Sequence, residues 1–244
     1  MAAIAVEVRG VKKRLGRNQA LAGVDLDFEP GLLHGVIGPD GAGKTTTMRL
    51  LMGLLRPDEG KIIFSRAGAP LDFAAIRPGM AYMPQRQSLY ADLSVGEHLD
   101  FFGDLYRLPP EVYGPRREEL LRITRLDKFV DRAAGQLSGG MYKKLGLMCA
   151  LLQSPNVLLL DEPTNGVDPI SRREFWALLY RLAEGGETTI IVTTAYMDEA
   201  ERCARVHLLD AGRALAQGEP RALLRAEGVS GFDAFFLKRA GVAA

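Results

Sequence analysis

The fold of this chain is decided by one stretch, Gly38-Pro39-Asp40-Gly41-Ala42-Gly43-Lys44-Thr45-Thr46. This stretch matches the phosphate-binding pattern G-x-x-x-x-G-K-[ST] at every fixed position. The apolar run at residues 32–37 predicts a strand directly before the loop, and residues 46–55 predict a helix after it. The pattern requires this order of strand, glycine-rich loop and helix, so we predict that the chain binds a nucleoside triphosphate.

The residue types in this loop each have a physical reason. Gly41 and Gly43 permit positive φ values and let the backbone come close to a phosphate. The backbone amides that follow converge on phosphate oxygens at a helix N-terminus, where the helix dipole favours anions. Lys44 supplies a positive charge for the β and γ phosphates, and the Thr45 hydroxyl is a Mg²⁺ ligand. The nucleotide-binding residues predicted here are Gly38, Asp40, Gly41, Ala42, Gly43, Lys44, Thr45 and Thr46.

A second motif combines an apolar run with two acidic residues. The four aliphatic residues 157–160 predict a strand that is buried on both faces of a parallel sheet. Asp161 and Glu162 follow at its carboxyl end, where open α/β sheets place their ligands. We expect Asp161 to hold Mg²⁺ through water, and Glu162 to orient and polarise the attacking water. The alternative is an ordinary strand end with solvated acids, and the phosphate-binding loop favours the magnesium site.

A third motif opens the helix expected at residues 139–152. Ser138 is suited to cap this helix, and Gly139 and Gly140 leave its first amides open to an anion. Ser-Gly-Gly is also a common turn, so the motif alone carries little information. Its place between the other two motifs, within a helical region, is what indicates a second phosphate-binding element.

The composition bounds the class of protein. The chain has 244 residues, which is enough for one large domain or two small lobes. Lys and Arg number 31 against 30 acidic residues, so the charge balance favours no nucleic acid and no anionic membrane as partner. No apolar run approaches the ~20 residues of a membrane helix, and no signal-peptide pattern is visible. Cys149 and Cys203 have no metal-type spacing and predict reduced thiols in the cytoplasm.

The order of the expected elements predicts an α/β fold with two additional lobes. Residues 4–9 and 21–28 alternate like strands and predict an N-terminal antiparallel β lobe. Residues 85 to about 154 contain only helical patterns, which predicts an inserted helical lobe. Residues 1–84 and 155–244 then form a P-loop NTPase core with a mostly parallel sheet flanked by helices. Further strands are expected at 60–64, 81–83, 189–193 and 206–209, and helices at 93–106, 116–123, 171–183, 197–203 and 221–226.

Together these motifs resemble the ATP-binding cassette family, the nucleotide-binding domains of ABC transporters, over essentially the whole chain. Residues 38–46 match the Walker A loop, Gln85 the Q-loop, residues 137–141 the signature, residues 160–162 the Walker B end and Asp168 the D-loop. Met141 in place of the usual Gln, and the segment 196–200, look like drug- or ABC-2-type exporter ATPases. The likeness extends to the amino-terminal cassette of tandem two-cassette exporter ATPases.

This resemblance implies a function and a set of roles. It implies ATP and Mg²⁺ as cofactors, with Glu162, Gln85 and Lys44 as catalytic residues and Thr45, Gln85 and Asp161 at the metal. It places Leu15 against the adenine, while Ser138, Gly139 and Gly140 face the nucleotide of a second cassette. The implied partners are that second cassette, identical or not, and membrane-spanning permease subunits. The implied location is peripheral, on the inner face of the cell membrane.

Two departures from the family pattern predict an asymmetric pair. The family has a histidine that contacts the γ-phosphate after the strand that follows the D-loop helix, and this chain has Ala195 there. The family usually stacks an aromatic residue on adenine, and this chain has Leu15 there. Stacking of a base on an aromatic side chain contributes about 1–3 kcal/mol in nucleic-acid binders, of which a leucine keeps only part. Both losses fall on the chain's own half-site, whereas its signature is intact.

Three other functions remain open on the sequence. A hydrolysis-poor regulatory subunit is favoured by Ala195 and opposed by the retained Glu162. A soluble cassette in translation or DNA repair would be expected to carry two cassettes or a long coiled-coil insertion, and neither is present in this sequence. A kinase or GTPase with the same phosphate-binding loop is opposed by the signature. The transported substrate cannot be read from the chain.

Overall fold

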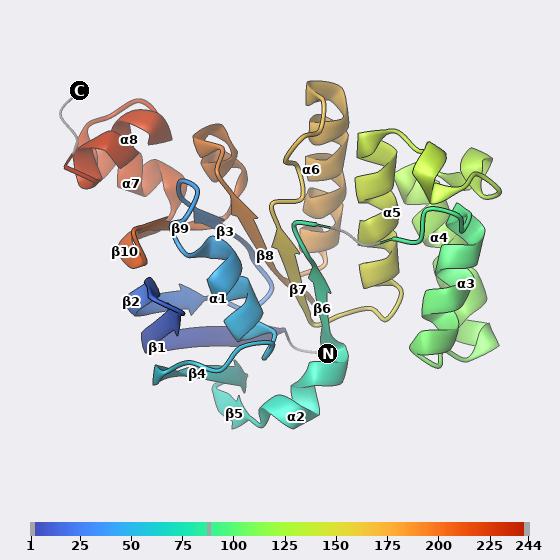
Figure 1. Cartoon of the computed structure of the whole chain (residues 1–244), viewed down its shortest axis with the longest axis horizontal. Helices are drawn as coiled ribbons and strands as arrows, with labels where there is room; N and C mark the ends of the chain where they lie inside the picture. Colours follow the sequence, from blue (N-terminus) through green and yellow to red (C-terminus); the bar gives the residue numbers. More distant parts are fainter. Residues whose placement is uncertain (1–2, 87–88, 242–244) are drawn as a thin grey trace.

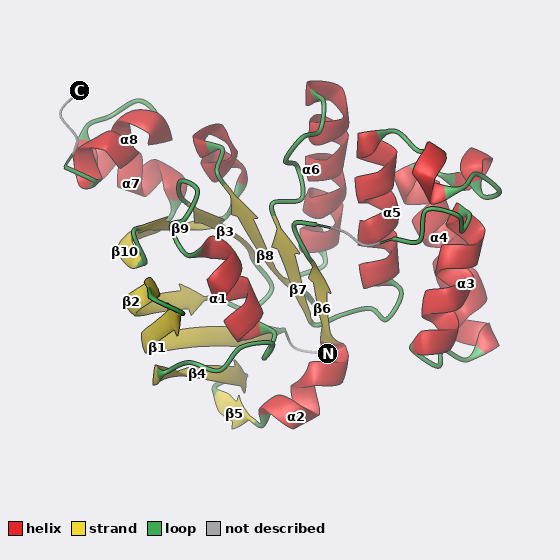
Figure 2. Ribbon diagram, in the orientation of Figure 1, coloured by secondary structure: helices red, strands yellow, loops and turns green. Residues whose placement is uncertain are grey.

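Two β-sheets share one hydrophobic interior, and helices cover the larger sheet (Figures 1 and 2). The computed structural model describes residues 3–86 and 89–241. None of the helices in these two ranges has the length and apolar character that a membrane span needs. The fold is α/β, with an antiparallel sheet and a mixed, mostly parallel sheet, as the sequence predicts.

The antiparallel sheet forms the expected N-terminal β lobe. Its strands, in spatial order, are β2 (Asn18–Phe28), β1 (Ile4–Leu15), β4 (Glu59–Arg66) and β5 (Ala69–Leu71). Alternation along β1 buries Ile4, Val6 and Val8 against the central sheet and the first helix. The strand continues beyond the expected residue 9 because it shifts register around Gly10, where φ is +58°, and then pairs on to Leu15.

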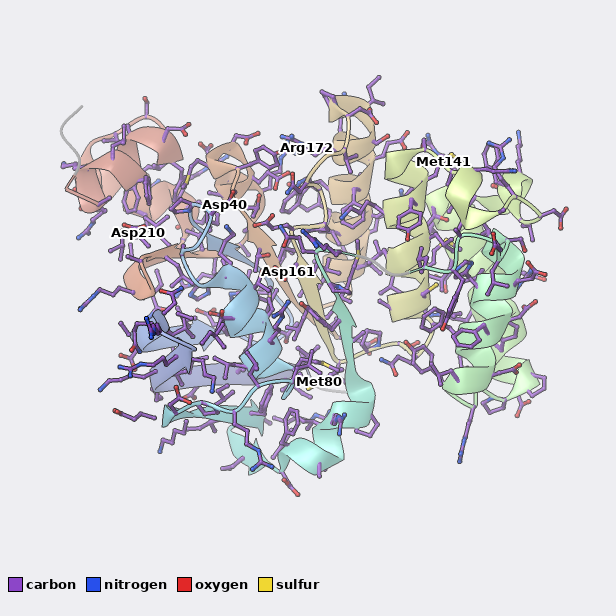
Figure 3. All side chains as sticks on the ribbon, viewed as in Figure 1. Asp40, Met80, Met141, Asp161, Arg172 and Asp210 are labelled. Carbon is purple, nitrogen blue, oxygen red and sulfur yellow. The ribbon has the colours of Figure 1, made fainter. Side chains whose placement is uncertain are left out.

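The central sheet carries the motifs at its carboxyl edge. Its strands, in spatial order, are β10 (Arg213–Gly218), β9 (Arg205–Asp210), β3 (Leu33–Ile37), β8 (Thr189–Thr194), β7 (Val157–Asp161) and β6 (Met80–Met83). All neighbours are parallel except the β9–β10 pair. Figure 3 places Met80, the first residue of β6, at the lower end of the sheet, and Asp161, the last residue of β7, above it. The carboxyl ends of these strands therefore meet at one edge.

Helices surround the central sheet and form the lobe beside it (Figure 1). The α-helices are α1 (Lys44–Leu51), α2 (Phe73–Ile76), α3 (Val95–Leu105), α4 (Pro110–Thr124), α5 (Gly139–Leu151), α6 (Pro169–Glu184), α7 (Pro220–Glu227) and α8 (Phe232–Arg239). The 3₁₀-helices are η1 (Arg77–Gly79), η2 (Asp127–Phe129), η3 (Ala134–Gln136) and η4 (Met197–Arg202). The described residues between β6 and β7 contain helices and no strand, which agrees with the pattern expected for the inserted lobe.

The central strands divide their side chains between two hydrophobic cores. Leu158, Leu160 and Val192 pack with α5 and α6 on one face of the sheet. Leu159 and Ile191, the alternate residues, pack with α1 and the antiparallel sheet on the other face. Every residue of β3, β7 and β8 is buried. A parallel strand that is covered on both faces reads as a continuous apolar run, which is the signal that predicted β7.

Several boundaries differ from the sequence expectation. Helix α4 begins at Pro110 rather than at residue 116, since a proline fits the first helical position and Pro115 is tolerated inside the helix. Residues 197–202 form the 3₁₀-helix η4 instead of an α-helix. Strand β10 follows Gly212, where only a turn was expected; it lies at a sheet edge, so its burial alternates weakly. These differences leave the lobes unchanged.

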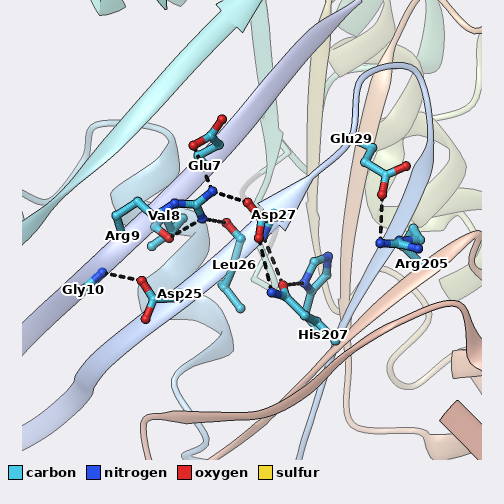
Figure 4. Close-up of polar contacts among 11 residues, drawn as sticks. Glu7, Val8, Arg9, Gly10, Asp25, Leu26, Asp27, Glu29, Arg205 and His207 are labelled. Carbon is cyan, nitrogen blue, oxygen red and sulfur yellow. Dashed lines mark hydrogen bonds and ion pairs between the residues drawn. The ribbon is translucent and has the colours of Figure 1, made fainter. Parts of the chain in front are cut away.

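A chain of polar contacts joins the antiparallel sheet to the central sheet (Figure 4). The buried rings of His34 in β3 and His207 in β9 approach to 3.3 Å between Nδ1 and Nε2. Nδ1 of His207 lies 3.1 Å from Oε1 of Gln217, which also accepts the backbone N–H of Asp27 in β2. Glu29, whose carbonyl oxygen lies 2.9 Å from the other ring nitrogen of His34, is ion-paired with Arg205. Two histidines therefore lie in the seam between the sheets.

Burial disfavours the charged form of both rings. It lowers the pKa of His34 to about 4, and the pKa of His207 to about 3. Nearby Glu29 and Asp27 favour the charged forms, whereas Arg205 opposes them, and burial dominates. Both folded pKa values lie below the value of about 6.5 in an unfolded chain. The stability that comes from these neutral rings is therefore present above pH 6.5 and lost as the pH falls toward about 4.

We expect His207→Asn to flatten the dependence of stability on pH. As the pH falls from 7.5 to 4.5, both histidines become protonated in the unfolded chain while they stay largely neutral in the folded protein. The free energy of unfolding therefore decreases, by about 1.4 kcal/mol for each unit by which a pKa is lowered. Replacing the His207 ring by asparagine removes the part of this decrease in stability that His207 causes. Urea unfolding of both proteins at several pH values measures the two slopes. Equal slopes would show that His207 does not titrate on unfolding.

Candidate functional site

The phosphate-binding loop connects β3 to α1, and two of its glycines are required by the surrounding backbone. A Cβ at Gly38 would lie 2.1 Å from the carbonyl oxygen of Leu209. Gly43 has a φ of +105°, and a Cβ there would lie 2.7 Å from the carbonyl oxygen of Ala20. Gly41 has a φ of +82° with open space around it. The loop is therefore held closely at both ends and free at its middle, where a phosphate would approach.

Lys44 is the first residue of α1, and its ammonium group is buried inside the loop. Nζ donates to the carbonyl oxygens of Gly38 at 2.8 Å and Pro39 at 3.0 Å. It also lies 3.1 Å from Oε1 of Glu162, and the two side chains are only 4% and 5% exposed. Asp40 is 94% exposed, with its carboxylate 3.9 Å from Nζ. The cation predicted for the phosphates thus faces the carboxylate predicted for the attacking water.

Glu162 receives two further hydrogen bonds at its other carboxylate oxygen. Oε2 accepts from Nε2 of Gln85 at 2.7 Å and from Nδ2 of Asn165 at 3.1 Å. The backbone of Glu162 has a φ of +46°, and its N–H donates to Oγ1 of Thr193 at 2.9 Å. The structure therefore brings the three predicted catalytic residues, Lys44, Gln85 and Glu162, into one cluster, in which Lys44 and Glu162 are buried and Gln85 is exposed.

Asp161 ends β7 as a fully buried carboxylate surrounded by hydroxyl groups. Thr45 Oγ1 donates to Oδ1 at 3.1 Å, and Thr193 Oγ1 donates to the same oxygen at 2.7 Å. The hydroxyl of Tyr82, on the neighbouring strand β6, donates to Oδ2 at 3.2 Å. Burial and then this carboxylate raise the pKa of Tyr82 to about 12, so the phenol stays protonated as a donor. A carboxylate and a threonine hydroxyl at this spacing suit a hard cation such as Mg²⁺.

A cavity of about 380 Å³ opens over these groups. Its lining includes Gly41, Gly43, Lys44, Thr45 and Thr46 of the loop, together with Gln85 and Glu162. Leu15, which the family resemblance places against adenine, is 41% exposed and lines the same cavity. Gly38 and Ala42 support the loop from outside the lining, and Ala42 is buried. Apart from Gly38 and Ala42, the predicted nucleotide residues of the N-terminal half thus line one cavity.

The signature residues lie elsewhere. Ser138 caps α5, accepting the N–H of Met141 at 3.3 Å, and none of Ser138, Gly139 and Gly140 lines the cavity. A Cβ at Gly140 would lie 2.4 Å from Oγ of Ser171, in the first turn of α6. Figure 3 shows Met141 and Arg172 at the upper ends of α5 and α6. One chain therefore does not bring its own signature to its own phosphate-binding loop.

Ala195 borders a second, smaller cavity beside the first. This cavity has a volume of about 210 Å³ and is lined by Asp40, Glu162 and Asn165 together with Thr194, Ala195 and Tyr196. Ala195 contributes no polar side-chain atom to it, which fits the missing histidine. The cysteines lie away from both cavities, as buried free thiols. Burial raises the pKa of Cys149 to about 12, and also raises the pKa of Cys203, in agreement with unreactive core residues.

Sequence reasoning missed four polar groups of this site. Asn165 lies three residues after Glu162 in a tight loop, a spacing that could have indicated the contact. Thr193 and Tyr82 reach Asp161 from the two neighbouring strands, and only the strand register reveals them. Nζ of Lys143, in α5, donates to the carbonyl oxygen of Gln85 at 3.3 Å, and burial lowers its pKa. This contact ties the helical lobe to the loop that carries Gln85.

Sequence comparison relates the chain to transporter ATP-binding proteins. The ABC transporter family profile matches residues 21–165. The probable multidrug ABC transporter ATP-binding protein YbhF of Escherichia coli K12 is 46% identical over 220 residues, which cover 89% of this chain and 38% of that protein. The daunorubicin resistance ATP-binding protein DrrA3 of Streptomyces coeruleorubidus is 41% identical over 219 residues, covering 89% and 69%. The Nod factor export ATP-binding protein I of Cupriavidus metallidurans is 38% identical over 223 residues, covering 91% and 73%. The chain thus spans well under half the length of the first of these relatives.

Solved structures of ATP-binding cassettes have the same fold. An ATP-binding subunit of an ABC transporter superposes with a TM-score of 0.83 at 29% identity, covering 96% of this chain and 99% of that one. A dimeric cassette in a post-hydrolysis state, bound to ADP and Pi, superposes with a TM-score of 0.75 at 26% identity, covering 88% and 98%. The sequence profile covers more than half of the chain, and the phosphate loop and the carboxylates of β7 meet in one site. The chain therefore belongs to the ABC transporter family, as an ATP-binding ATPase domain.

Proposed function

We propose that the chain is the ATP-binding and ATP-hydrolysing subunit of a membrane export complex. The observation that carries this proposal is the buried pair of Lys44 and Glu162 beside the phosphate-binding loop, with Gln85 hydrogen-bonded to Glu162. Phosphoryl transfer to water needs a cation for the phosphates, a carboxylate for the attacking water and groups that hold both in place. The relatives named for multidrug transport, drug resistance and Nod factor export support the direction of transport.

In this proposal each residue of the cluster has one task. Lys44 leaves its carbonyl partners to pair with the β and γ phosphates, and Glu162 accepts a proton from the attacking water. Thr45, Asp161 and Gln85 would hold magnesium, because their side-chain oxygen atoms suit a hard cation and those of Thr45 and Asp161 lie 3.1 Å apart. The bound ion would supply positive charge to the phosphates.

We further propose that two cassettes enclose ATP head to tail. The signature residues Ser138, Gly139 and Gly140 lie outside the chain's own cavity, so they are available to a nucleotide on a second cassette. The dimeric cassette with ADP and Pi supports this arrangement as an analogy. Nucleotide binding then favours the closed pair, and hydrolysis with product release favours the open one.

The proposed membrane partner contacts the helical lobe near Gln85. An apolar cavity of about 230 Å³ lies between β6, α3 and α5, and its lining includes Leu89, Phe102 and Tyr106. Met83 and Pro84, which directly precede Gln85, line the same cavity. Tyr90, which is 56% exposed, follows this lining. Permease subunits seated here would place the chain on the inner face of the cell membrane.

The finer proposal is an asymmetric pair in which this chain's own site is the weaker one. Ala195 lacks the polar group that the family presents to the γ-phosphate, and Leu15 replaces the aromatic residue at the base. A second, non-identical cassette would then carry the stronger Walker motifs and use the signature of this chain. If the loss at Ala195 is complete, the chain serves as a hydrolysis-poor regulatory subunit, which is the second candidate function.

Lys44→Ala is expected to abolish measurable ATP binding. The ammonium group is the only side-chain cation lining the described cavity, so its loss leaves the phosphates with amide donors alone. Titration with a fluorescent ATP analogue measures the change, with Lys61→Ala on the exposed surface of β4 as the control. Binding within a few-fold of the unaltered protein would contradict this role for Lys44.

The isolated chain is expected to be a weak ATPase that Ala195→His improves. Removing one preorganised donor in other enzymes costs about 10²–10³ in rate, and a histidine here would restore a donor to the smaller cavity. We expect an increase of at least tenfold in the phosphate release rate. Ala222→His, on the exposed face of α7, controls for the added ring. Robust turnover that Ala195→His leaves unchanged would contradict the prediction.

Two substitutions distinguish the sites of an asymmetric pair. Ser138→Arg puts bulk and charge where the partner's phosphate approaches, so it should stop ATP hydrolysis and export. Glu162→Gln should reduce both far less than the same change in the partner cassette does. The reconstituted complex provides the assay, with Ser230→Arg on an exposed loop as the matched control. Equal and complete loss from both Glu→Gln changes would show two equivalent sites.

A further inference from the structure

A fully buried carboxylate, Glu199, lies in η4, the short helix after β8. A buried charge is costly unless donors surround it, so its partners reveal what it holds. Oε1 accepts from the indole Nε1 of Trp176 at 2.9 Å and from the hydroxyl of Thr164 at 2.9 Å. The Thr164 hydroxyl also lies 3.1 Å from Oε2, and Arg172 Nε lies 3.8 Å from Oε1. One carboxylate thus joins η4 to the loop that carries Thr164 and to α6, which carries Trp176 and Arg172.

The loop that carries Thr164 also carries the groups that act on the attacking water. Thr164 is 1% exposed, two residues after Glu162 and directly before Asn165, and its hydroxyl is the anchor of this loop to η4. Asn165 donates to the Glu162 carboxylate. Glu162 itself has a φ of +46°, a conformation that non-glycine residues keep only when their surroundings fix it. The position of the Glu162 carboxylate therefore depends on how firmly this loop is held.

Glu199 also lies near the segment at residues 194–196, which carries Ala195. Arg172 stacks on the ring of Tyr196, with 4.2 Å from its guanidinium carbon to the ring centroid, while its Nε faces Glu199. The N–H of Tyr196 donates to Oγ1 of Thr194 at 3.0 Å. Residues 194–196 and Glu162 with Asn165 line the cavity of about 210 Å³ from two sides. The Glu199 carboxylate thus hydrogen-bonds Thr164 on one wall of this cavity, and it lies 3.8 Å from the arginine that stacks on Tyr196 of the other wall.

We propose that Glu199 is a positioning residue for ATP hydrolysis. It acts through Thr164, which it holds so that Glu162 and Asn165 keep their place against the segment 194–196. The inference rests on the proposed function in one respect, namely that Glu162 acts on the attacking water. Binding of ATP depends instead on residues 38–46, which Glu199 does not contact among the described residues.

Thr164→Val removes the hydroxyl and keeps the shape of the side chain. We expect kcat for ATP hydrolysis to fall at least tenfold, while KM and the affinity for a fluorescent ATP analogue change less than threefold. Thr188→Val is the matched control, because the Thr188 hydroxyl donates to the Pro155 carbonyl oxygen at 2.8 Å at the opposite end of the same strands. Equal falls in kcat from both variants would overturn the proposal.

Two changes at Glu199 separate hydrogen bonding from charge. Gln keeps an acceptor for Thr164 and Trp176, so Glu199→Gln should keep kcat within about threefold of the unaltered protein. Glu199→Leu removes both bonds and should reduce kcat as Thr164→Val does. Complete loss from Glu199→Gln with unchanged ATP affinity would overturn a role based on these hydrogen bonds.

Amide hydrogen exchange tests whether Glu199 holds the Thr164 loop in place, and it requires no ATP hydrolysis. The amides of residues 164–168 and 195–198 should exchange faster in Thr164→Val and in Glu199→Leu, whereas the amides of β7 and β8 should not. Faster exchange throughout the sheet would indicate general destabilisation and overturn the proposal. If the unaltered protein hydrolyses no ATP with its partner cassette, the proposed function fails, and the exchange measurement still decides whether Glu199 positions the loop.

Discussion

The buried ion pair between Lys44 and Glu162 is the interaction on which the site depends. Its two charges are almost completely removed from water, so each is tolerated only because the other is present. Strand β8 lies between β3 and β7, the strands that lead to these residues, so the pair spans the carboxyl edge of the sheet. A phosphate that enters the loop finds the Lys44 ammonium group already in place. It competes for this cation with the Glu162 carboxylate, to which we assign the attacking water.

The neighbouring strands β8 and β6 add hydroxyl groups to the site. Strand β8 contributes the Thr193 hydroxyl, and β6 contributes the Tyr82 hydroxyl, both to Asp161. Because parallel strands end at one edge, a set of residues from four strands converges without any long loop. The inserted lobe adds the amine of Lys143 on the carbonyl of Gln85. The sheet therefore supplies most of the polar groups of the site, and this contact of α5 links the helical lobe to the segment that carries Gln85.

Local patterns predicted the centre of this arrangement and missed its surroundings. The motifs at residues 38–46 and 157–162 are each continuous in sequence, so the loop, the buried strand and the two carboxylates could be predicted from local patterns. The partners of Asp161 were not, because Tyr82 reaches it only through the register that pairs Met83 with Leu160. The hydrogen bond between Thr164 and Glu199 joins residues 35 positions apart, so no local pattern indicates it. The helix predicted at residues 116–123 begins at Pro110, and β10 was missed because an edge strand has little alternation to detect.

The close contact between Gly140 and Ser171 constrains the two half-sites differently. Any side chain at residue 140 would push into the first turn of α6, so a change there would damage the fold of this chain as well as the signature that we propose for a second cassette. A change at residue 195 alters a side chain that lines a cavity and leaves the packing intact. Folding of this chain therefore constrains residue 140 more strongly than residue 195.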